Sequence, residues 1–436
     1  MTKPASPAAH APERQPTDWK SAAMQKRIRR RYAAERRFRM LGAGAVIVSA
    51  AFLAFLLVTM VAQGWRGFTA TELALPLDLK AAQLKVTREQ LNSPAADLAL
   101  ASGGLEEAVQ NAAVTAFGPD GASFLAPSAW VWVRDAVKRD PSLLERRATI
   151  NVPAATGFDQ ALTGDGDAAM EAGVARLTRQ NAIRRGFNWT FLHESDSTDP
   201  VAVGIWGALK GSLMTMAITF LIAFPVGVLS AIYLEEYAPK NRWTDLIEVS
   251  INNLAAVPSI IFGLLGLAVF LGTWEIGGRV YGPMLPRSAP IVGGVTLALM
   301  IMPVIVIASR NAIKGVPPSI RDAALGIGAS PIQVVFHHVL PLALPGILTG
   351  TIIGMARALG ETAPLLLIGM RAFIVTPPGS FTDPATVLPV QIFLWSDEVS
   401  RGFVEKTSAA ILVLLAVLLA MNGLAIYLRN KFETRW

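Results

Sequence analysis

The sequence of 436 residues contains no cysteine and only four histidines. Without cysteine, the chain has no disulfide, no thiolate nucleophile and no cysteine-ligated metal. His10, His193, His337 and His338 do not form a metal-ligand constellation on one predicted surface. We therefore expect no metal site in this chain.

Three common catalytic motifs are also missing. The sequence holds no G-x-x-x-x-G-K-[ST] phosphate-binding loop, no G-x-S-x-G nucleophile elbow and no H-E-x-x-H zinc motif. The chain is therefore not expected to bind ATP through a phosphate-binding loop or to catalyse a covalent step. We expect a non-enzymatic protein that binds no cofactor itself.

Charged residues are scarce as well. Only 16% of the chain is charged and 52% is hydrophobic, with a mean hydropathy of +0.44, whereas soluble domains carry roughly 25% charged residues. This composition indicates an integral membrane protein. The net charge of +7 does not indicate a nucleic-acid partner, because nine of the Lys and Arg residues lie between Lys20 and Arg39, beside an apolar run. Such a cluster is a topology signal.

Long apolar runs predict six transmembrane helices. Residues 1–39 form a basic tail, and residues 40–63 form the first helix, which is too long and too far from the N-terminus for a signal peptide. Five further runs cover residues 204–234, 251–272, 290–308, 345–369 and 408–428. The basic N-terminal tail and the basic end RNKFETRW both predict cytoplasmic termini. The expected fold is an all-α polytopic membrane protein.

Residues 64–202 differ from the rest because they contain no apolar run of 18 residues. We expect one soluble extracytoplasmic domain after the first helix, with turns at 118–121, 151–153 and 163–167 and helix-like periodicity at 79–92 and 167–181. Asp165, Asp167 and Glu171 do not have the spacing of an EF-hand, so a solvated turn is favoured over a calcium loop. No activity can be assigned to this domain.

Four prolines, Pro225, Pro258, Pro303 and Pro364, fall inside predicted membrane helices. Each one removes a backbone donor and favours a kink. Kinked helices suit a transporter that must bend, but proline is also simply commoner in membrane helices than in soluble ones. Both interpretations remain open.

A polar segment, residues 313–341, connects two of the apolar runs on the cytoplasmic side. Asp322-Ala323-Ala324 is predicted to begin a short helix, with the acid near its positive end. Gly326 and Gly328 allow a tight turn; Pro331 is predicted to open a second short helix and Pro341 to end it. On spacing alone, the segment is equally suited to docking on another protein and to lying on the membrane surface.

The next apolar segment carries two charges, Arg357 and Glu361, one helical turn apart. A charge at mid-bilayer costs about 2.5–3.5 kcal/mol on insertion scales, so the pair is expected to face a water-filled path or a partner helix rather than lipid. The alternative is a self-compensating structural ion pair. Arg310 and Lys314 lie at the cytoplasmic end of the fourth helix, where we interpret them as membrane anchors rather than an anion exit.

Several stretches resemble a known family. The run D-A-A-x-x-x-G at 322–328, followed by Leu340-Pro341, is similar to the EAA loop of ABC importer permeases, with Asp322 where Glu is usual and His338 where an aliphatic residue is usual. Residues 204–239, 252–270 and especially RALGETAPLLLIG at 357–369 resemble PstA-type permeases of bacterial phosphate importers. The resemblance covers residues 203–430, and the N-terminal part looks like the enlarged region of some members.

The resemblance implies a type I ABC permease core in the bacterial inner membrane. It implies ATPase coupling through Asp322, Ala323, Ala324, Gly328, Leu340 and Pro341, and a phosphate pathway past Arg357 and Glu361. The implied partners are a PstC-type permease, a PstB-type ATPase dimer that holds ATP and Mg, a PstS-type phosphate-binding protein, inorganic phosphate and the lipid bilayer. An ABC permease for another oxyanion, such as molybdate or sulfate, is an alternative within the same interpretation.

Two other classes of function stay open. One is an anion carrier or channel that works without an ATPase, which would not need the docking segment. The other is a membrane-anchored sensor in which residues 64–202 bind a ligand.

Overall fold

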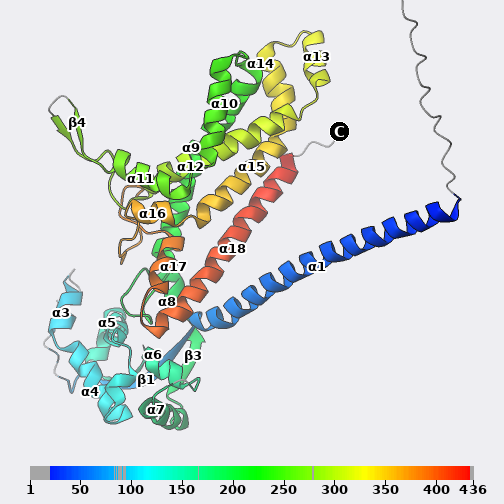
Figure 1. Ribbon diagram of the computed structural model, residues 1–436. Coiled ribbons are helices and arrows are strands. Elements are labelled where there is room, and N and C mark those ends of the chain that lie inside the picture. The colour runs from blue at the N-terminus through cyan, green and yellow to red at the C-terminus, as the bar shows by residue number, and fades with distance from the viewer. Residues whose placement is uncertain are drawn as a thin grey trace, which may run out of the picture. The chain divides into compact units, whose positions relative to one another are not determined.

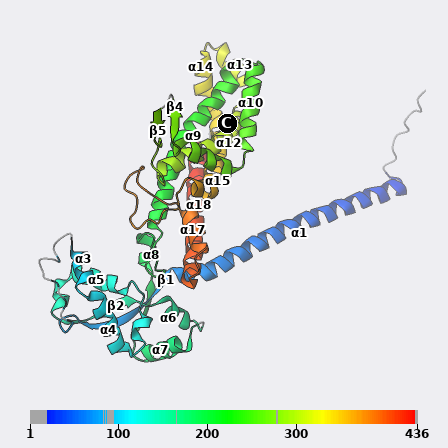
Figure 2. The ribbon, with the colours of Figure 1, turned by 60° about the vertical axis from the view of Figure 1, so that its left-hand side comes forward.

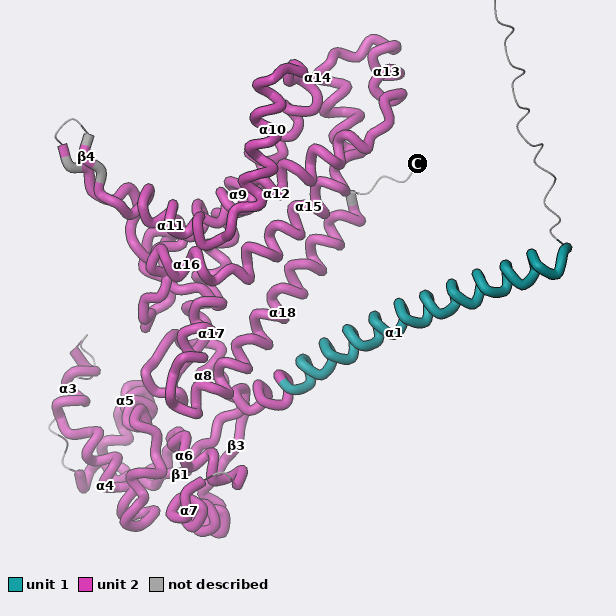
Figure 3. The backbone as a smooth tube through the Cα atoms, viewed as in Figure 1, with its two compact units in different colours: residues 1–59 teal, residues 60–436 magenta. Residues whose placement is uncertain are grey.

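The computed structural model describes residues 20–82, 84, 86, 91, 95–164, 166–276 and 279–432. The chain divides into two compact units, residues 1–59 and 60–436 (Figure 3). In the first unit, the described part is the beginning of helix α1 (Ala22–Gly67), which turns from basic to apolar at Met40. The rest of the chain, including the last turns of α1, belongs to the second unit.

Five helices of the described chain are long and apolar enough to cross a membrane, and α1 is the first. The others are α9 (Trp206–Ile232) with its π-helical extension η3 (Tyr233–Tyr237), α12 (Pro290–Lys314), α15 (Leu340–Gly360) with the helical turns before it, and α18 (Arg401–Phe432) (Figure 1). The count rises to six if α10 (Arg242–Ala255) and α11 (Ser259–Phe270) form one span. The six predicted helices therefore include one broken pair.

Proline explains the break. The axes of α10 and α11 differ by 103°, and Pro258 stands directly before α11, where its ring and missing N–H prevent the helix from continuing. Pro364 likewise lies in the first turn of the short helix α16 (Ala363–Leu367). The prediction that one continuous helix runs through each of these two prolines is therefore wrong, whereas Pro225 and Pro303 do lie inside α9 and α12.

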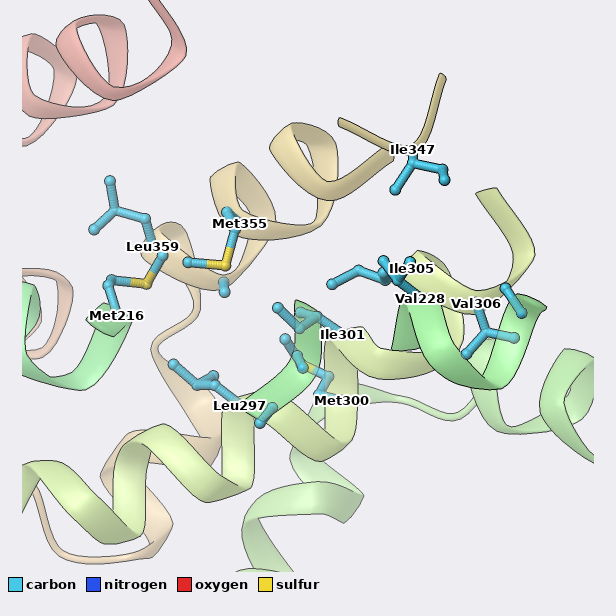
Figure 4. Close-up of a cluster of buried hydrophobic side chains, with 14 of the residues drawn as sticks. Met216, Val228, Leu297, Met300, Ile301, Ile305, Val306, Ile347, Met355 and Leu359 are labelled. Carbon is cyan, nitrogen blue, oxygen red and sulfur yellow. The ribbon is translucent and has the colours of Figure 1, made fainter. Parts of the chain in front are cut away.

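The helical core is centred on α12, which packs against α9 on one side and α15 on another. Ile301 and Ile305 of α12 are fully buried and meet side chains from both neighbouring helices, among them Val228 and Met355 (Figure 4). This packing makes α12 the most enclosed of these membrane helices, because 61% of its most apolar 18-residue stretch is buried.

Small residues allow α15 to approach α12 closely. A Cβ at Gly350 would lie 2.1 Å from Cβ of Ala308, and one at Gly346 would lie 2.7 Å from Cβ of Ala312. Gly346 and Gly350 are four residues apart, as are Ala308 and Ala312, so each pair occupies one helix face. Such small-residue faces favour tight association of helices in membranes, where no hydrophobic effect drives it.

The predicted docking segment forms two helical pieces. Helix α13 (Pro318–Gly326) is followed by a turn and by α14 (Pro331–Gln333), which continues through the π-helical turn η4 (Val334–Val339) into α15. The prediction that Pro341 ends the second helix is therefore wrong. The N–H of Leu340 reaches back five residues to the carbonyl of Val335, and this wider turn accommodates the proline rings of α15.

Residues 64–202 contain a sheet that the sequence analysis did not predict. Strands β1 (Thr69–Asp78), β2 (Arg147–Pro153) and β3 (Ile183–Phe187) pair antiparallel in the order β2-β1-β3. Alternate leucines of β1, including Leu73 and Leu75, are fully buried. The all-α description therefore applies to the membrane part of the described chain, apart from the antiparallel pair of strands β4 (Trp274–Ile276) and β5 (Arg279–Tyr281) between α11 and α12.

Helices surround this sheet and share its hydrophobic core (Figure 2). They are α3 (Ala96–Ser102), α4 (Leu105–Phe117), η1 (Gly121–Phe124), α5 (Ala129–Arg139), η2 (Pro141–Leu144), α6 (Thr156–Ala161) and α7 (Ala168–Arg179). Helix α7 confirms the periodicity seen at 167–181. Half of the residues in 79–92 and the whole of 1–19 lie outside the described residues, as does Asp165 of the rejected calcium loop. Residues 151–153 end β2 rather than forming a turn.

The sheet domain joins the membrane helices at α8 (Trp189–His193) and at the start of α18. Nζ of the buried Lys406 donates to the carbonyl oxygen of Gly67 at 3.0 Å and lies 5.4 Å from the ring centroid of Phe191. Nearby, a Cβ at Gly402 would lie 2.8 Å from Thr156. Helix α17 (Leu388–Ser396) also packs against α18. The domain is therefore attached through side-chain contacts as well as through the backbone.

Candidate coupling loop and paired charges

The loop between α12 and α15 presents the predicted coupling residues on its outer surface and along a groove. Asp322 and Ala323 are exposed, whereas Ala324 is buried. Asp322 is the fifth residue of α13, and the first turn of that helix contains no acid. The expectation that Asp322 sits at the positive end of the helix is therefore wrong, because α13 already begins at Pro318.

The turn between the two helical pieces is tightly defined. Gly328 has a φ of +89°, a left-handed conformation that glycine adopts without steric cost. Ser330 then begins α14 with a capping box, in which its hydroxyl and backbone N–H are both bonded to Gln333. A residue with a Cβ would be strained at this φ, so Gly328 sets the turn between α13 and α14.

Large apolar side chains are exposed around this turn. Leu325 is 50% exposed, Ile327 83%, Ile332 60% and Phe336 43%. A single exposed apolar residue needs no explanation, but a cluster at one tip is typical of an interaction surface. We call these four residues the loop tip.

A groove of about 1050 Å³ runs beside the loop tip. It is lined by the end of α12, by α13, by η4 and by the start of α15, and its wall is mainly apolar. Of the predicted coupling residues, Ala323, Ala324 and Pro341 line it, together with His338. Leu340 packs against the hydrophobic core instead. The structure thus brings most of the predicted coupling residues to one end of the molecule.

Arg321 fixes α13 to two membrane helices. Its Nη2 lies 2.7 Å from Oε1 of Glu236 in η3. The same guanidinium donates to the carbonyl oxygen of Ile313, in the last turn of α12, at 3.0 Å and to that of Val316, two residues beyond the helix, at 2.7 Å. Carbonyl groups at a helix end have unused acceptor capacity, so Arg321 binds there while it pairs with an acid from the extension of α9.

A second set of ion pairs lies beside the first. Arg310 is only 8% exposed and pairs with Glu235 and, at 2.8 Å, with Glu248 of α10. Lys314 also approaches Glu235, at 3.4 Å. Acids from residues 235–248 therefore enclose the charge of Arg310. The interpretation of Arg310 and Lys314 as membrane anchors stays a prediction.

The pairing of these charges is not predicted from the sequence. The signal was present, since four acids fall in residues 235–248 and the cations Arg310, Lys314 and Arg321 follow the next apolar run but one. However, the partners are 62 to 85 residues apart, and single-sequence patterns do not specify such distant pairs.

Arg357 and Glu361 lie at the other end of α15. Nε of Arg357 is 3.4 Å from Oε1 of Glu361, and their side chains are 47% and 18% exposed, respectively. Helix α15 ends at Gly360, so Glu361 is a cap residue with extended backbone (φ −75°, ψ 126°). The expected kink beside Pro364 is therefore a complete break of the helix between the two charges.

The structure does not bring the paired charges and the coupling loop together. Sixteen residues separate Pro341 from Arg357 in sequence, which corresponds to about 24 Å along an α-helix. Any communication between the two sites must pass through the body of α15 or through its neighbours α12 and α9.

Comparison with known proteins places the membrane part of the chain. Residues 223–434 match the family described as binding-protein-dependent transport system inner membrane component. The probable ABC transporter permease protein YqgH of Bacillus subtilis is 31% identical over 252 residues, or 57% of this chain and 76% of that protein. The chain belongs to this family of ABC transport permeases.

Other members of the family are named for phosphate transport. The phosphate transport system permease protein PstA of Yersinia pestis is 30% identical over 223 residues, or 51% of this chain and 71% of that protein. The chain spans 62% of the length of the probable permease YqgI of Bacillus subtilis, at 33% identity. A solved structure of the MetNI methionine ABC transporter aligns with 53% of this chain at 19% identity and a TM-score of 0.41.

The N-terminal part matches separately. Residues 25–172 correspond to a domain of unknown function, DUF3333. The expected membership of the ABC permease family, the transmembrane helices and the enlarged N-terminal region are thus confirmed. The roles of the coupling residues and of the paired charges stay predictions.

Proposed function

We propose that this chain is one of two permease subunits of an ATP-driven phosphate importer in a bacterial inner membrane. The observation that carries the proposal is the loop tip: an exposed apolar surface on two short helices, held rigidly to α9 and α12 by Arg321. Such a surface suits a partner that pushes on the loop. Similarity to PstA proteins supports phosphate as the substrate.

The loop tip is the proposed docking site for a separate ATPase dimer of the PstB type. Asp322 and Ala323 are exposed there, and Gly328 sets the turn that presents them. ATP and Mg would be held by the ATPase, and this chain contributes no group to hydrolysis. Because Arg321 links α13 to η3 and to the end of α12, a displacement of the loop would move α9 and α12 with it.

Arg357 is the proposed contact for the transported anion. Its planar guanidinium presents donors in a fork that matches phosphate oxygens, and its side chain is half exposed at the surface of this chain. Glu361, at 3.4 Å, would accept a hydrogen bond from the hydroxyl of hydrogen phosphate. Sulfate carries no proton at neutral pH, so the carboxylate would repel it.

Both residues need a second surface to complete a pathway. Arg357 lies outside the buried core of its own chain, whereas its neighbours Ala358 and Leu359 are inside it. We propose that a PstC-type permease covers this side and that a PstS-type protein delivers phosphate. With the termini in the cytoplasm, residues 64–202 would lie on the delivery side.

Reconstitution tests the proposal directly. This chain would be co-expressed with candidate permease, ATPase and binding-protein subunits, purified as a complex and placed in liposomes with labelled phosphate. We expect uptake that requires ATP hydrolysis and the binding protein, and that excess sulfate does not suppress. Uptake of molybdate or sulfate instead would support a different oxyanion. Full uptake by this chain without an ATPase would support a carrier, and ligand binding by residues 64–202 without any uptake would support a sensor.

A further inference from the structure

Aromatic side chains are exposed where the sheet domain meets the membrane helices. Trp65, near the end of α1, is 66% exposed, and Trp206, the first residue of α9, is 41% exposed. Between them in sequence, Phe187 at the end of β3 is 49% exposed and Trp189 at the start of α8 is 63% exposed. Large aromatic groups of this kind are expensive to leave in water.

The pairing of β1 with β3 places the exposed rings of Phe187 and Trp189 beside the end of α1. Strand β1 begins two residues after α1 ends, and its first residue, Thr69, pairs with Phe187. The N–H of Asn188 donates to the carbonyl oxygen of Phe68 at 2.8 Å. Phe187 and Trp189 are thus held beside the point where the chain leaves α1. The N–H of Ile205, just before α9, in turn donates to the carbonyl oxygen of Phe191.

The aromatic rings form a continuous cluster rather than isolated residues. The ring centroids of Phe187 and Trp189 are 4.8 Å apart, and those of Phe68 and Phe187 are 6.4 Å apart. Phe68 also contacts the buried Phe191 in an edge-to-face arrangement. The exposed rings are therefore anchored to the core, and their outward faces are fixed in place.

Two cationic side chains precede Phe187 on strand β3, with Gly186 between them and the ring. Arg184 and Arg185 of β3 are exposed, and their Cα partners in β1 are Glu72 and Thr71. At about 3.3 Å per residue, these two positions lie roughly 7–10 Å farther along the strand than Phe187. Arg185 reaches an acid only at 3.9 Å, from Asp159. Aromatic rings at a span's end, with arginines just beyond them, match the order of layers in a bilayer.

We propose that the edge formed by β3 and α8, residues 183–193, lies in the lipid headgroup layer. The rings of Phe187 and Trp189 rest at the boundary with the acyl chains, and Arg184 and Arg185 contact lipid phosphates. Lipid is favoured over a protein partner because the edge is continuous with the ends of two helices that themselves enter the bilayer. The inference does not depend on the transported substrate or on which side of the membrane the domain occupies.

The contact would give the sheet domain a fixed height and tilt on the membrane. The domain is already attached at its base through Lys406, Gly67 and Phe191. A second attachment through lipid would prevent rotation about that base. The domain would then present the same surface to the aqueous side throughout the transport cycle.

Site-specific fluorescence labelling tests the proposal. Because the sequence contains no cysteine, one introduced cysteine is the single labelling site. Gly186 suits the label, because a Cβ there meets nothing within 4 Å and the substitution leaves Phe187 and Trp189 unchanged. The matched control is Leu98 of α3, an exposed apolar residue of the same domain, at 72% exposure. Gly186→Cys and Leu98→Cys would each carry an environment-sensitive fluorophore. The full chain would be placed in nanodiscs of phosphatidylethanolamine and phosphatidylglycerol.

Quenching by lipids that carry a spin label near the headgroup provides the readout. We expect at least twofold stronger quenching at Gly186→Cys than at Leu98→Cys, and a decrease when Trp189→Ala is added. Replacing Arg184 and Arg185 by Gln should remove any dependence on the fraction of phosphatidylglycerol. Equal quenching at the two sites would overturn the proposal. So would a protected, blue-shifted label that spin-labelled lipid does not quench, because it would show that a protein covers the edge.

Discussion

At the scale of single residues, Arg357 and Glu361 combine proximity with incomplete burial. Their side chains meet at 3.4 Å across the end of α15, yet half of the arginine side chain remains exposed. Arginine before glutamate is the weaker order for a pair within one helix, and Glu361 lies outside regular helix. The exposed part of the guanidinium is accessible from outside this chain, which is the geometry that the proposed anion contact requires.

Replacing either charge should impair transport. We expect Arg357→Gln to lower ATP-dependent phosphate uptake by at least tenfold and Glu361→Gln to weaken discrimination against sulfate. Both effects would be measured in liposomes that contain the assembled complex. Arg429→Gln serves as the control, because Arg429 is partly exposed near the end of α18 and its side chain donates hydrogen bonds to Oδ1 of its neighbour Asn430. If both variants at the pair transport like the control variant, the pair is structural.

Asp196, between α8 and α9, gives a pH dependence whose sign follows from its surroundings. Burial raises the pKa of its carboxyl above the usual 3.8, against the opposing hydrogen bonds from Trp395 and from the N–H of Ser197. Between pH 3.8 and the raised pKa, the folded state binds more protons than the unfolded state. The free energy of unfolding therefore falls as pH rises through that interval and levels off above it.

Asp196→Asn should remove this contribution while keeping an acceptor for Trp395. We expect the variant's thermal midpoint to decrease less than that of the parent protein as pH rises from 4 into the neutral range. Scanning fluorimetry of the purified chain in detergent would measure it. Asp383→Asn, in an exposed turn, controls for general charge effects. Parallel curves for Asp196→Asn and the parent would contradict the assignment.

At the scale of elements, the contacts of α13 decide how the coupling loop acts on the membrane helices. Arg321 bonds to Glu236 and to two carbonyl groups at the end of α12, while Arg310 joins η3 to α10. Four elements therefore meet at one cluster of charges. We propose that these contacts let a displacement of the loop reach the membrane helices.

Breaking the link between Arg321 and Glu236 should uncouple the transporter. We expect Glu236→Arg to leave the ATPase bound and active but to reduce phosphate moved per ATP several-fold, and the exchange Glu236→Arg with Arg321→Glu to restore part of the ratio. The ratio of uptake to hydrolysis is the measurement, since loss of folding alone would lower both together. Glu398→Arg, in an exposed stretch before α18, is the control. An unchanged ratio in Glu236→Arg would argue against transmission through this pair.

Close packing of α15 on α12 carries a separate prediction. Gly350→Leu would place side-chain atoms where Ala308 lies, because even a Cβ would come within 2.1 Å of that residue. Overpacking of this kind typically costs about 1–3 kcal/mol, and we expect a lower thermal midpoint of the detergent-solubilised chain. Gly423→Leu in α18, where a Cβ meets nothing within 4 Å, should change it little. Equal midpoints for the two variants would contradict the packing described here.

The elements also show what the sequence can and cannot predict. Long apolar runs predict membrane helices well, because length and composition are local properties. The same local rules do not tell Pro225, which α9 tolerates, from Pro258, where α10 and α11 part, since packing on either side decides the outcome. The sequence does not predict strand β1, because its pairing partners lie 69 to 81 residues away in β2 and more than 100 residues away in β3. Pairing at such distances leaves little local signal.

The candidate site follows the same division. Short local motifs are enough to identify the candidate residues Asp322, Gly328, Arg357 and Glu361, because each motif lies within one stretch of sequence. The ion pairs of Arg310 and Arg321 depend on acids brought near by the packing of α9 and α10 against α12. No spacing rule within one stretch specifies them, and Arg310 was accordingly assigned to the membrane surface.

At the scale of the whole molecule, three attachments define the second unit. The coupling loop is tied to α9 and α12 by charges, α15 is packed on α12 through glycines, and the sheet domain is joined to α18 through Lys406. The proposed ATPase surface and the proposed anion contact occupy opposite ends of α15. Under this proposal, the close packing of α15 on α12 would carry a displacement from one end to the other.

The most direct test of this account measures phosphate uptake by the reconstituted complex with and without a hydrolysing ATPase. The account predicts uptake that stops when the ATPase carries a substitution that abolishes hydrolysis, and that also falls when the loop tip is disrupted by Ile327→Asp. Uptake that continues at full rate in the absence of ATP hydrolysis would contradict the central claim that this chain moves phosphate only when a partner drives its coupling loop.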